Sequence, residues 1–246
     1  MAKKRGTLRI GTCGFTFPEW RGTFYPESLD PAQWLPYYAE HFDSLELRLP
    51  FFRLPASAVL EKWRTDSPDG FRFATRANKV ITHNKMLRGC GKDLSRFRGS
   101  MARLGSKLDA VLWQLPSGFQ QDLRRLDVFL KVVTQTWRTR HAVQFRHPTW
   151  LEPCTYRLLQ RHNVSLVNSD ALRGVVEGIA TADFVYVRKH GPRGSARKAY
   201  GERALRDEAE RIAQWLDEGL DVLVYFDNHT SGFALKNAQR LRELCG

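Results

Sequence analysis

The chain has 246 residues, of which 42% are hydrophobic and 12% aromatic, and its 39 Lys and Arg residues against 26 Asp and Glu residues give a formal net charge of +13. That apolar content can fill a sizeable core, which argues against intrinsic disorder. The positive charge attracts anions, of which nucleic acid is the common bulky one, but the basic residues are spread along the chain and form no single patch.

Cysteine spacing and the first residues bear on the compartment. The four cysteines lie far apart and include no CxxC pair, which favours a reducing, intracellular setting. The first ten residues carry a basic cluster without the apolar stretch of a signal peptide, and no window has the length and apolarity of a membrane span. We expect a soluble, cytoplasmic protein with no membrane contact. The oligomeric state stays open at this stage.

Eight runs of strand-like composition alternate with segments of helical spacing. The predicted strands are Leu8 to Cys13, Ser44 to Leu49, Phe71 to Arg76, Ala110 to Leu115, Ala142 to His147, Val164 to Ser169, Phe184 to Lys189 and Val222 to Asp227. This alternation predicts an α/β fold, a TIM-type (β/α)8 barrel of parallel strands alternating with helices, as one domain over residues 1–246. The alternative is an open doubly wound sheet. Such a sheet would typically have a GxGxxG turn after its first strand, but here the first strand is followed by the aromatic-rich segment FTFPEW.

The intervening segments carry helix signals. Asp30 and Pro31 resemble an N-cap with proline at the first helical position, and Pro36 should bend or restart that helix. Gly219 is a stop signal for the helix before the last strand. Three apolar stripes have helical spacing: Leu94, Phe97, Met101 and Leu104; Leu123, Leu126, Leu130 and Val133; Leu205, Ala209, Ile212 and Leu216.

Four of the predicted strands carry an arginine near their carboxyl ends, and alternation directs each of these side chains into the barrel mouth. The arginines are Arg48, Arg76, Arg146 and Arg188. The same mouth is expected to hold Glu46, Gln114, Gln144, Asn168, Asp170, His190 and Asn228. Arginine suits bidentate recognition of phosphate or carboxylate, so we predict an anionic ligand. Alternatively, Glu46 and Asp170 pair with two arginines and the others reach solvent.

Glu46, Asp170 and His190 are the candidate acid/base residues of this mouth. Arg188 shares a strand face with His190, and a cationic neighbour favours the neutral imidazole that can act as a base. The metal alternative would use His83, His147, His190, Glu46, Asp170 and Asp227. Because these residues lack tight ligand spacing and the arginines oppose a cation, we predict no metal and no cofactor.

Three other features could contribute to the mouth. Cys13 is a candidate nucleophile, although a small buried cysteine near a barrel rim is the commoner arrangement. The aromatic residues between 15 and 25 could stack on a base or sugar, or plug the mouth. The glycine-rich basic loop from 190 to 201 suits phosphate binding, or is solvated surface. The two longest irregular stretches, Thr16 to Asp30 and His190 to Gly201, both follow strands and belong to the active face of a barrel.

Several motifs occur together in order along the chain. They are GTCGF at 11–15, FYP at 24–26, FRFATR at 71–76, ITH at 81–83, QLP at 114–116, FRHPTW at 145–150, YVRKHG at 186–191 and VYFDNHTSGFALKNA at 224–238. Jointly they resemble the YecE-like family, grouped as domain of unknown function 72. That resemblance implies a TIM-barrel-type fold and brings little information on function.

The chain departs from the pattern of that family at four positions. Cys13 and Phe15 stand where serine and tryptophan are expected, Arg48 replaces an asparagine, and Gln144 replaces a glutamate before the RH pair. The last two changes make the mouth more cationic and remove a candidate base or metal ligand.

Our leading functional hypothesis is an enzyme acting on a phosphate-bearing substrate, either a small anion or nucleic acid, bound by the arginine-lined mouth. The alternatives are a nucleic-acid-binding protein without catalysis and a degenerate barrel with a structural or interaction role. The changes at Arg48 and Gln144 favour the last of these.

Overall fold

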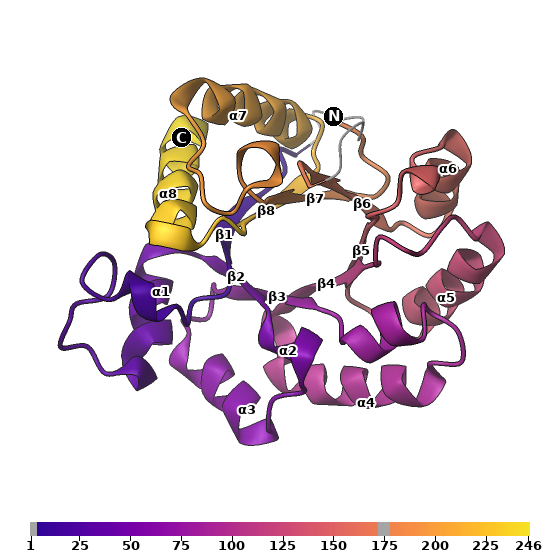
Figure 1. The fold of residues 1–246 in the computed structure, drawn as a ribbon, viewed down its shortest axis with the longest axis horizontal. Coiled ribbons are helices and arrows are strands. Elements are labelled where there is room, and N and C mark those ends of the chain that lie inside the picture. Colours follow the sequence, from indigo (N-terminus) through magenta and orange to yellow (C-terminus); the bar gives the residue numbers. More distant parts are fainter. Residues whose placement is uncertain (1–3, 172–177) are drawn as a thin grey trace.

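The computed structural model describes residues 4–171 and 178–246, and its core is a closed barrel of eight parallel strands in sequence order with helices around it (Figure 1). The strands are β1 Leu8–Cys13, β2 Ser44–Leu47, β3 Arg72–Arg76, β4 Leu108–Gln114, β5 Arg140–Gln144, β6 Ser165–Ser169, β7 Phe184–Lys189 and β8 Asp221–Phe226. β1 pairs with both β2 and β8, which closes the sheet. The predicted TIM-type barrel is therefore confirmed.

The α-helices lie outside the strands, as Figure 1 shows. They are α1 Trp34–His41, α2 Leu49–Phe52, α3 Ser57–Asp66, α4 Gly91–Met101, α5 Leu123–Thr136, α6 Pro153–Arg161, α7 Glu202–Asp217 and α8 Phe233–Cys245. Both α2 and α3 lie between β2 and β3. In the β6–β7 connection, residues 178–183 form no helix, so strict alternation does not hold in the described part of that segment.

Side chains alternate between the barrel interior and the layer beneath the helices. The interior cluster combines small and large residues: Cys13, Ala74, Ala110, Leu112, Ala142, Val167, Phe184, Tyr186, Leu223 and Tyr225. Alanines on β3, β4 and β5 leave room for the tyrosines of β7 and β8, so the interior is filled with side chains and forms no open pore. Polar groups at the carboxyl ends of the strands lie above this packed layer.

The predicted helix stripes face the barrel. Leu126, Leu130 and Val133 of α5 are fully buried, and the side chain of Asp122 caps that helix by accepting from the backbone N–H of Arg125. The stripe of α7 is likewise buried. Gly219 follows α7 with a φ of +78°, so its role as a stop signal is confirmed.

The first helix restarts as expected. Asp30 caps a short 3-10 turn, Pro31–Gln33, by accepting from the backbone N–H of Ala32, and α1 begins only at Trp34, so that Pro36 falls in its first turn. A proline is tolerated there because the first backbone N–H groups of a helix have no partner inside the helix.

Two predicted strands end two or three residues earlier than expected. β2 stops at Leu47, and Arg48 already has α-helical dihedral angles before α2. β5 stops at Gln144, so Arg146 lies beyond the sheet. These two arginines therefore come from connecting segments, which place them higher on the rim than Arg188 within β7. In the described part of the chain, every helix is too short or too polar to cross a bilayer.

Candidate functional site at the barrel mouth

Arg188 on β7 lies at the centre of the mouth. Its side chain is 1% exposed and pairs with Glu46 of β2 at two points: Nε lies 2.9 Å from Oε2, and Nη2 lies 2.8 Å from Oε1. The hydroxyl of Tyr186 donates to the same Oε2 at 2.7 Å. This forked geometry is what arginine offers a carboxylate. Glu46, predicted as an acid/base residue, is thus engaged in holding Arg188.

The remaining donors of Arg188 bind other strands. Nη1 lies 2.9 Å from Oε1 of Gln144, 3.3 Å from Oε1 of Gln114 and 3.1 Å from Nε2 of His190. Nη2 also lies 3.1 Å from Oδ2 of Asp227. A guanidinium has five N–H donors, and described side chains accept from all three of its nitrogens. Arg188, which the sequence suggested as a ligand-binding residue, thus bonds to side chains of β2, β4 and β5, to His190 just after its own strand and to Asp227 just after β8.

His190 is held as a neutral imidazole. Arginine has no acceptor, so the contact with Arg188 makes Nε2 the acceptor and leaves the ring proton on Nδ1. Nδ1 faces Oδ1 of Asp170 at 3.3 Å, and the backbone N–H of His190 donates to that oxygen at 2.8 Å. Burial, reinforced by Arg188, lowers the pKa of His190 despite the bond to Asp170. The predicted Asp170 and His190 therefore form a pair in which the carboxylate orients the ring.

The pair is fastened by the loop that follows β7. Tyr200 donates its hydroxyl to Asp170 and accepts from the backbone N–H of Gly191 at 2.6 Å. Burial would raise the pKa of Asp170, but the hydrogen bonds from His190 and Tyr200 outweigh burial and lower it. Gly191 has a φ of +109°, and a Cβ there would lie 1.9 Å from the carbonyl oxygen of Ser195. Only glycine fits this turn.

The guanidinium group of Arg76, at the end of β3, has no hydrogen-bond partner in the described part of the chain. Its guanidinium carbon lies 3.5 Å from the ring centroid of Phe51 in α2, and its buried Nε is unpaired. Burial, followed by the charge of Arg188, lowers the pKa of Arg76 to about 10. The residue is thus a half-buried cation that stacks on an aromatic face while its donors remain unused.

The guanidinium group of Arg146, just beyond β5, has only one long hydrogen-bond contact in the described part of the chain. Its Nη2 lies 3.4 Å from Nε2 of His190, and its buried Nε has no partner among the described residues. Burial and then Arg188 lower the pKa of Arg146. Arg188 lowers the pKa of both Arg76 and Arg146, and Arg146 also lowers that of Arg76, as expected for guanidinium groups that lie close together.

Arg48 lies at the outer edge of the mouth. Its Nη1 is 3.8 Å from Oδ1 of Asp227, a loose ion pair, and its guanidinium carbon lies 5.6 Å from the ring centroid of Phe17. Burial would raise the pKa of Asp227, but Arg188, then His190 and Arg48, outweigh it and lower that pKa. Asp227 is therefore an ionised carboxylate between the buried arginine and the rim arginine.

His83, between β3 and α4, adds an imidazole to the arginine side of the mouth. The hydroxyl of Thr82 lies 2.8 Å from Nδ1 and 3.4 Å from the carbonyl oxygen of Asn78, so Nδ1 is engaged in a hydrogen bond. No described residue bonds to Nε2. Burial, followed by Arg76 and Arg146, lowers the pKa of His83. Sequence analysis placed this histidine only in the metal alternative.

Two residues assigned to the mouth lie elsewhere. Asn228 is fully buried beneath the loop after β7, where its Nδ2 donates to the carbonyl oxygen of Lys198 and to Oδ1 of Asn237, both at 3.0 Å. Asn168 bonds to the backbone of the β6–β7 connection. The residues that point into the mouth are their neighbours, Ser169 and Asp227. The predicted alternation was therefore one residue out of phase at the ends of β6 and β8.

The nucleophile and metal alternatives are not supported by the geometry. Cys13 is 1% exposed, and burial raises the pKa of its thiol well above the usual range, so the reactive thiolate is disfavoured. His147 uses Nδ1 to accept from the backbone N–H of Thr149 at 3.3 Å. Within residues 4–171 and 178–246, no three His, Cys, Asp or Glu side chains are grouped so that they could hold a metal ion.

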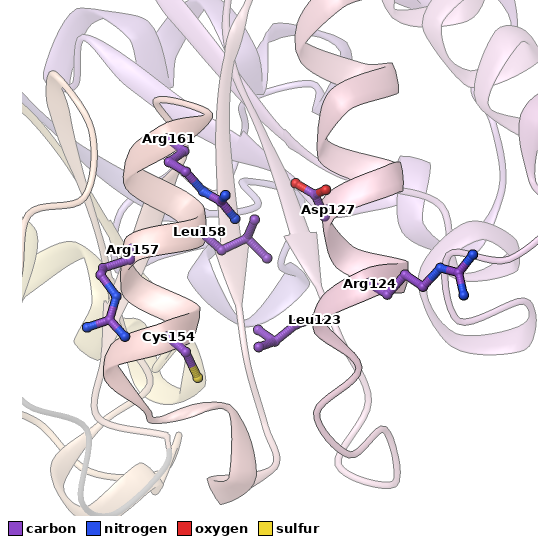
Figure 2. Close-up of a pocket in the computed structure, with 7 residues that line it drawn as sticks. All are labelled: Leu123, Arg124, Asp127, Cys154, Arg157, Leu158 and Arg161. Carbon is purple, nitrogen blue, oxygen red and sulfur yellow. The ribbon is translucent and has the colours of Figure 1, made fainter.

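Arginines also line a cavity of about 560 Å³ between α5 and α6, and none of its lining residues belongs to the mouth. Leu123 and Leu158 lie between the helices, and Arg161 points toward Asp127 (Figure 2). The side chains of Arg124 and Arg157 extend away from the cavity in different directions. This cavity therefore lacks the arrangement of converging donors that an anion requires.

Comparison with known proteins places the chain among its relatives. The sequence model described as "Protein of unknown function DUF72" matches residues 9–246. The chain belongs to this DUF72 family. The UPF0759 protein YecE of Escherichia coli K12 is 30% identical over 112 residues, which cover 45% of this chain and 40% of that relative. The UPF0759 protein YunF of Bacillus subtilis is 22% identical over 90% of both chains.

Solved structures of the DUF72 family share the barrel. A member from Thermotoga maritima is 27% identical and superimposes with a TM-score of 0.85, covering 97% of this chain and 98% of its own. A member from Enterococcus faecalis is 19% identical, with a TM-score of 0.82 and coverage of 97% and 95%. The second likeness bears on the fold alone. The names of these relatives state no activity, so the function is argued from the mouth itself.

Proposed function

We propose that the protein binds a phosphate-bearing small molecule in the barrel mouth through Arg76 and Arg146. The observation that carries this proposal is the contrast between these two arginines and Arg188. Arg188 has its donors taken by Glu46 and other strand ends, whereas Arg76 and Arg146 each hold a buried, unpaired Nε. An unpaired buried donor costs about 1–3 kcal/mol, and an anion would supply the missing acceptor.

The pKa values of the two arginines support the same proposal. Burial and like charge lower both, so the free mouth is electrostatically unfavourable and an anion would relieve it. Phosphate matches this site because its oxygens can accept from two guanidinium groups at once. Arg48, at the outer edge of the mouth, adds a third cation that an entering anion would pass.

The proposal includes proton transfer by an imidazole, which would make the protein an enzyme. His83 is the stronger candidate because no described residue bonds to its Nε2, while the hydroxyl of Thr82 engages its Nδ1 at 2.8 Å. His190 is oriented by Asp170, but its Nε2 already accepts from Arg188. We therefore assign general acid/base chemistry first to His83 and give His190 the role of positioning Arg146.

Inorganic phosphate tests the binding step. The unfolding temperature is measured against phosphate concentration for the wild type, for Arg146→Gln and for Arg157→Gln, an exposed arginine of α6 that serves as the matched charge control. We expect phosphate to stabilise the wild type and the control alike. Arg146→Gln should lose about 10- to 100-fold in affinity, as a charged hydrogen bond contributes about 1.5–3 kcal/mol.

Stability without phosphate gives a second readout. Because Arg146→Gln removes a half-buried, unpaired charge, it should melt no lower than the wild type in phosphate-free buffer. Equal phosphate response in all three proteins, or none in the wild type, would rule out the mouth as a phosphate site.

A further inference from the structure

A second cavity, of about 460 Å³, opens beside the mouth and is largely aromatic. The residues of its wall that matter here are Phe15, Phe17, Phe52, Trp63, Arg48 and His229. Phe52 is 54% exposed, an unusual state for a large apolar side chain in this protein. The volume is in the range of cavities that hold cofactors and other small ligands, about 300–1,000 Å³.

The cavity and the mouth share α2 as a common wall. On one side of this helix, Phe51 carries the guanidinium of Arg76 on its ring face and touches His83 edge-on, with ring centroids 5.0 Å apart. On the other side, the neighbouring Phe52 lines the cavity. One molecule in contact with both sides of α2 would reach the mouth arginines and the cavity together.

Arg48 connects the two spaces electrostatically. It lines the cavity, lies 3.8 Å from the mouth carboxylate of Asp227 and is 5.6 Å from the ring centroid of Phe17. A cation at this point can contact an anionic group while the aromatic wall holds the rest of the molecule.

The aromatic wall is preorganised for a flat ring. Phe17 stacks on His229, with centroids 4.5 Å apart and planes at 17°. The turn after β1 packs directly beneath, since a Cβ on Gly14 would lie 3.2 Å from both Arg48 Cδ and Phe17 Cε2. Trp63 is fixed against Phe15 in an edge-to-face contact at 6.1 Å. Stacked and edge-on aromatic side chains offer the surfaces on which planar rings bind.

We propose that this cavity binds the planar aromatic ring of the same molecule whose phosphate lies among the mouth arginines, so that the ligand class is a nucleoside monophosphate. This inference rests on the proposed function and names its ligand. The ring would pack against Phe17 and Phe52, and the phosphate would lie between Arg48 and the pair Arg76 and Arg146. Stacking on such residues tolerates any base, because each base has a π-face.

The test compares three probes by isothermal titration: inorganic phosphate, adenosine 5′-monophosphate and adenosine. We expect the nucleotide to bind the wild type about 5- to 150-fold more tightly than phosphate, the gain that base stacking supplies. Phe52→Ala should reduce this ratio several-fold and leave phosphate affinity unchanged, and Phe52→Tyr should restore the ratio. Val128→Ala on α5 is the matched control, because Val128 is 58% exposed and distant from the cavity lining.

The outcomes separate this inference from the one it rests on. Equal affinity for phosphate and nucleotide, or a ratio that Phe52→Ala leaves intact, overturns the aromatic site while the phosphate site stands. Failure of both phosphate and nucleotide to bind overturns the two together. A third outcome is that adenosine and its monophosphate bind with equal affinity and that Arg146→Gln changes neither affinity. This result overturns the phosphate site and its link to the cavity.

Discussion

The buried ion pair between Arg188 and Glu46 controls what every other residue of the mouth can do. With the arginine 1% exposed and the carboxylate fully buried, neither charge has water to replace a lost partner. Glu46→Gln should therefore destabilise the protein by about 3–5 kcal/mol, the usual cost of breaking a buried pair from one side. Urea unfolding at pH 7 measures this loss.

The double variant Glu46→Gln with Arg188→Met provides the control. Removing both charges eliminates the uncompensated guanidinium, so the double variant should be more stable than Glu46→Gln alone. A single variant within about 1 kcal/mol of the wild type would mean that Asp227 alone can neutralise Arg188, and the central role given to Glu46 would be wrong.

Sequence alternation locates single residues where the strand is regular. Glu46, Arg76, Gln114, Gln144 and Arg188 lie on the inner face of the barrel, where the period of two puts them. What alternation cannot supply is which donors are already used. The partners of Arg188 come from positions up to 175 residues away, the farthest being Cys13, and such pairing follows from the closed barrel and not from local pattern. Asn228 was misplaced because alternation was counted one residue out of phase at the end of β8.

At the scale of elements, the outer face of β5 contains a buried titratable group. His141 is 2% exposed beneath α5, where Nδ1 accepts from the indole N–H of Trp113 at 3.2 Å and Nε2 lies 3.2 Å from the carbonyl oxygen of Trp137. Burial, against the hydrogen bonds to backbone carbonyl groups, lowers the pKa of His141 to about 4. The folded protein thus holds this imidazole neutral.

This burial predicts a pH dependence of stability. Between the ordinary histidine pKa of about 6.5 and the folded value of about 4, the unfolded chain binds the proton and the folded chain does not. Stability from this site is therefore present above the unfolded pKa and lost as the pH falls. From pH 7 to pH 5 the loss is about 2 kcal/mol.

The variant His141→Gln isolates that contribution. Glutamine keeps an acceptor for Trp113 without titrating, so the change in unfolding free energy between pH 7 and pH 5 should shrink by about 2 kcal/mol relative to the wild type. Parallel pH profiles for the two proteins would contradict the assignment. His162, which pairs with Asp127 at 2.7 Å, is present in both proteins, so its contribution cancels in this comparison.

The helical and strand periods of the sequence were together sufficient to predict the barrel architecture. The stripe of α7 and the strand composition of β7 each specify one element, and their order specifies the barrel. The ends of elements were less predictable. β2 and β5 stop two and three residues early, because Arg48 and His147 begin turns whose geometry depends on Pro50 and Pro148 in the following segment.

At the scale of the whole molecule, the formal charge of +13 concerns association more than fold. Part of the charge lies on the loop after β7, where Arg193, Arg197 and Lys198 are exposed. More lies on α5 and α6, where the arginine side chains diverge (Figure 2). Scattered charges of this kind form no shaped pocket, which separates this surface from the mouth, where Arg188 and Arg146 both contact His190.

We therefore expect weak, sequence-independent binding of an oligonucleotide that falls steeply with salt, since each phosphate contact contributes about 0.9 to the slope of log K against log salt. Replacing Arg193, Arg197 and Lys198 together by glutamine should reduce that slope by up to about 3, measured by fluorescence anisotropy across a salt series. Arg146→Gln should leave the slope unchanged, because Arg146 is half-buried, whereas Arg193, Arg197 and Lys198 are exposed. An oligonucleotide complex that Arg146→Gln abolishes would instead assign nucleic acid to the mouth and contradict a small phosphate-bearing ligand there.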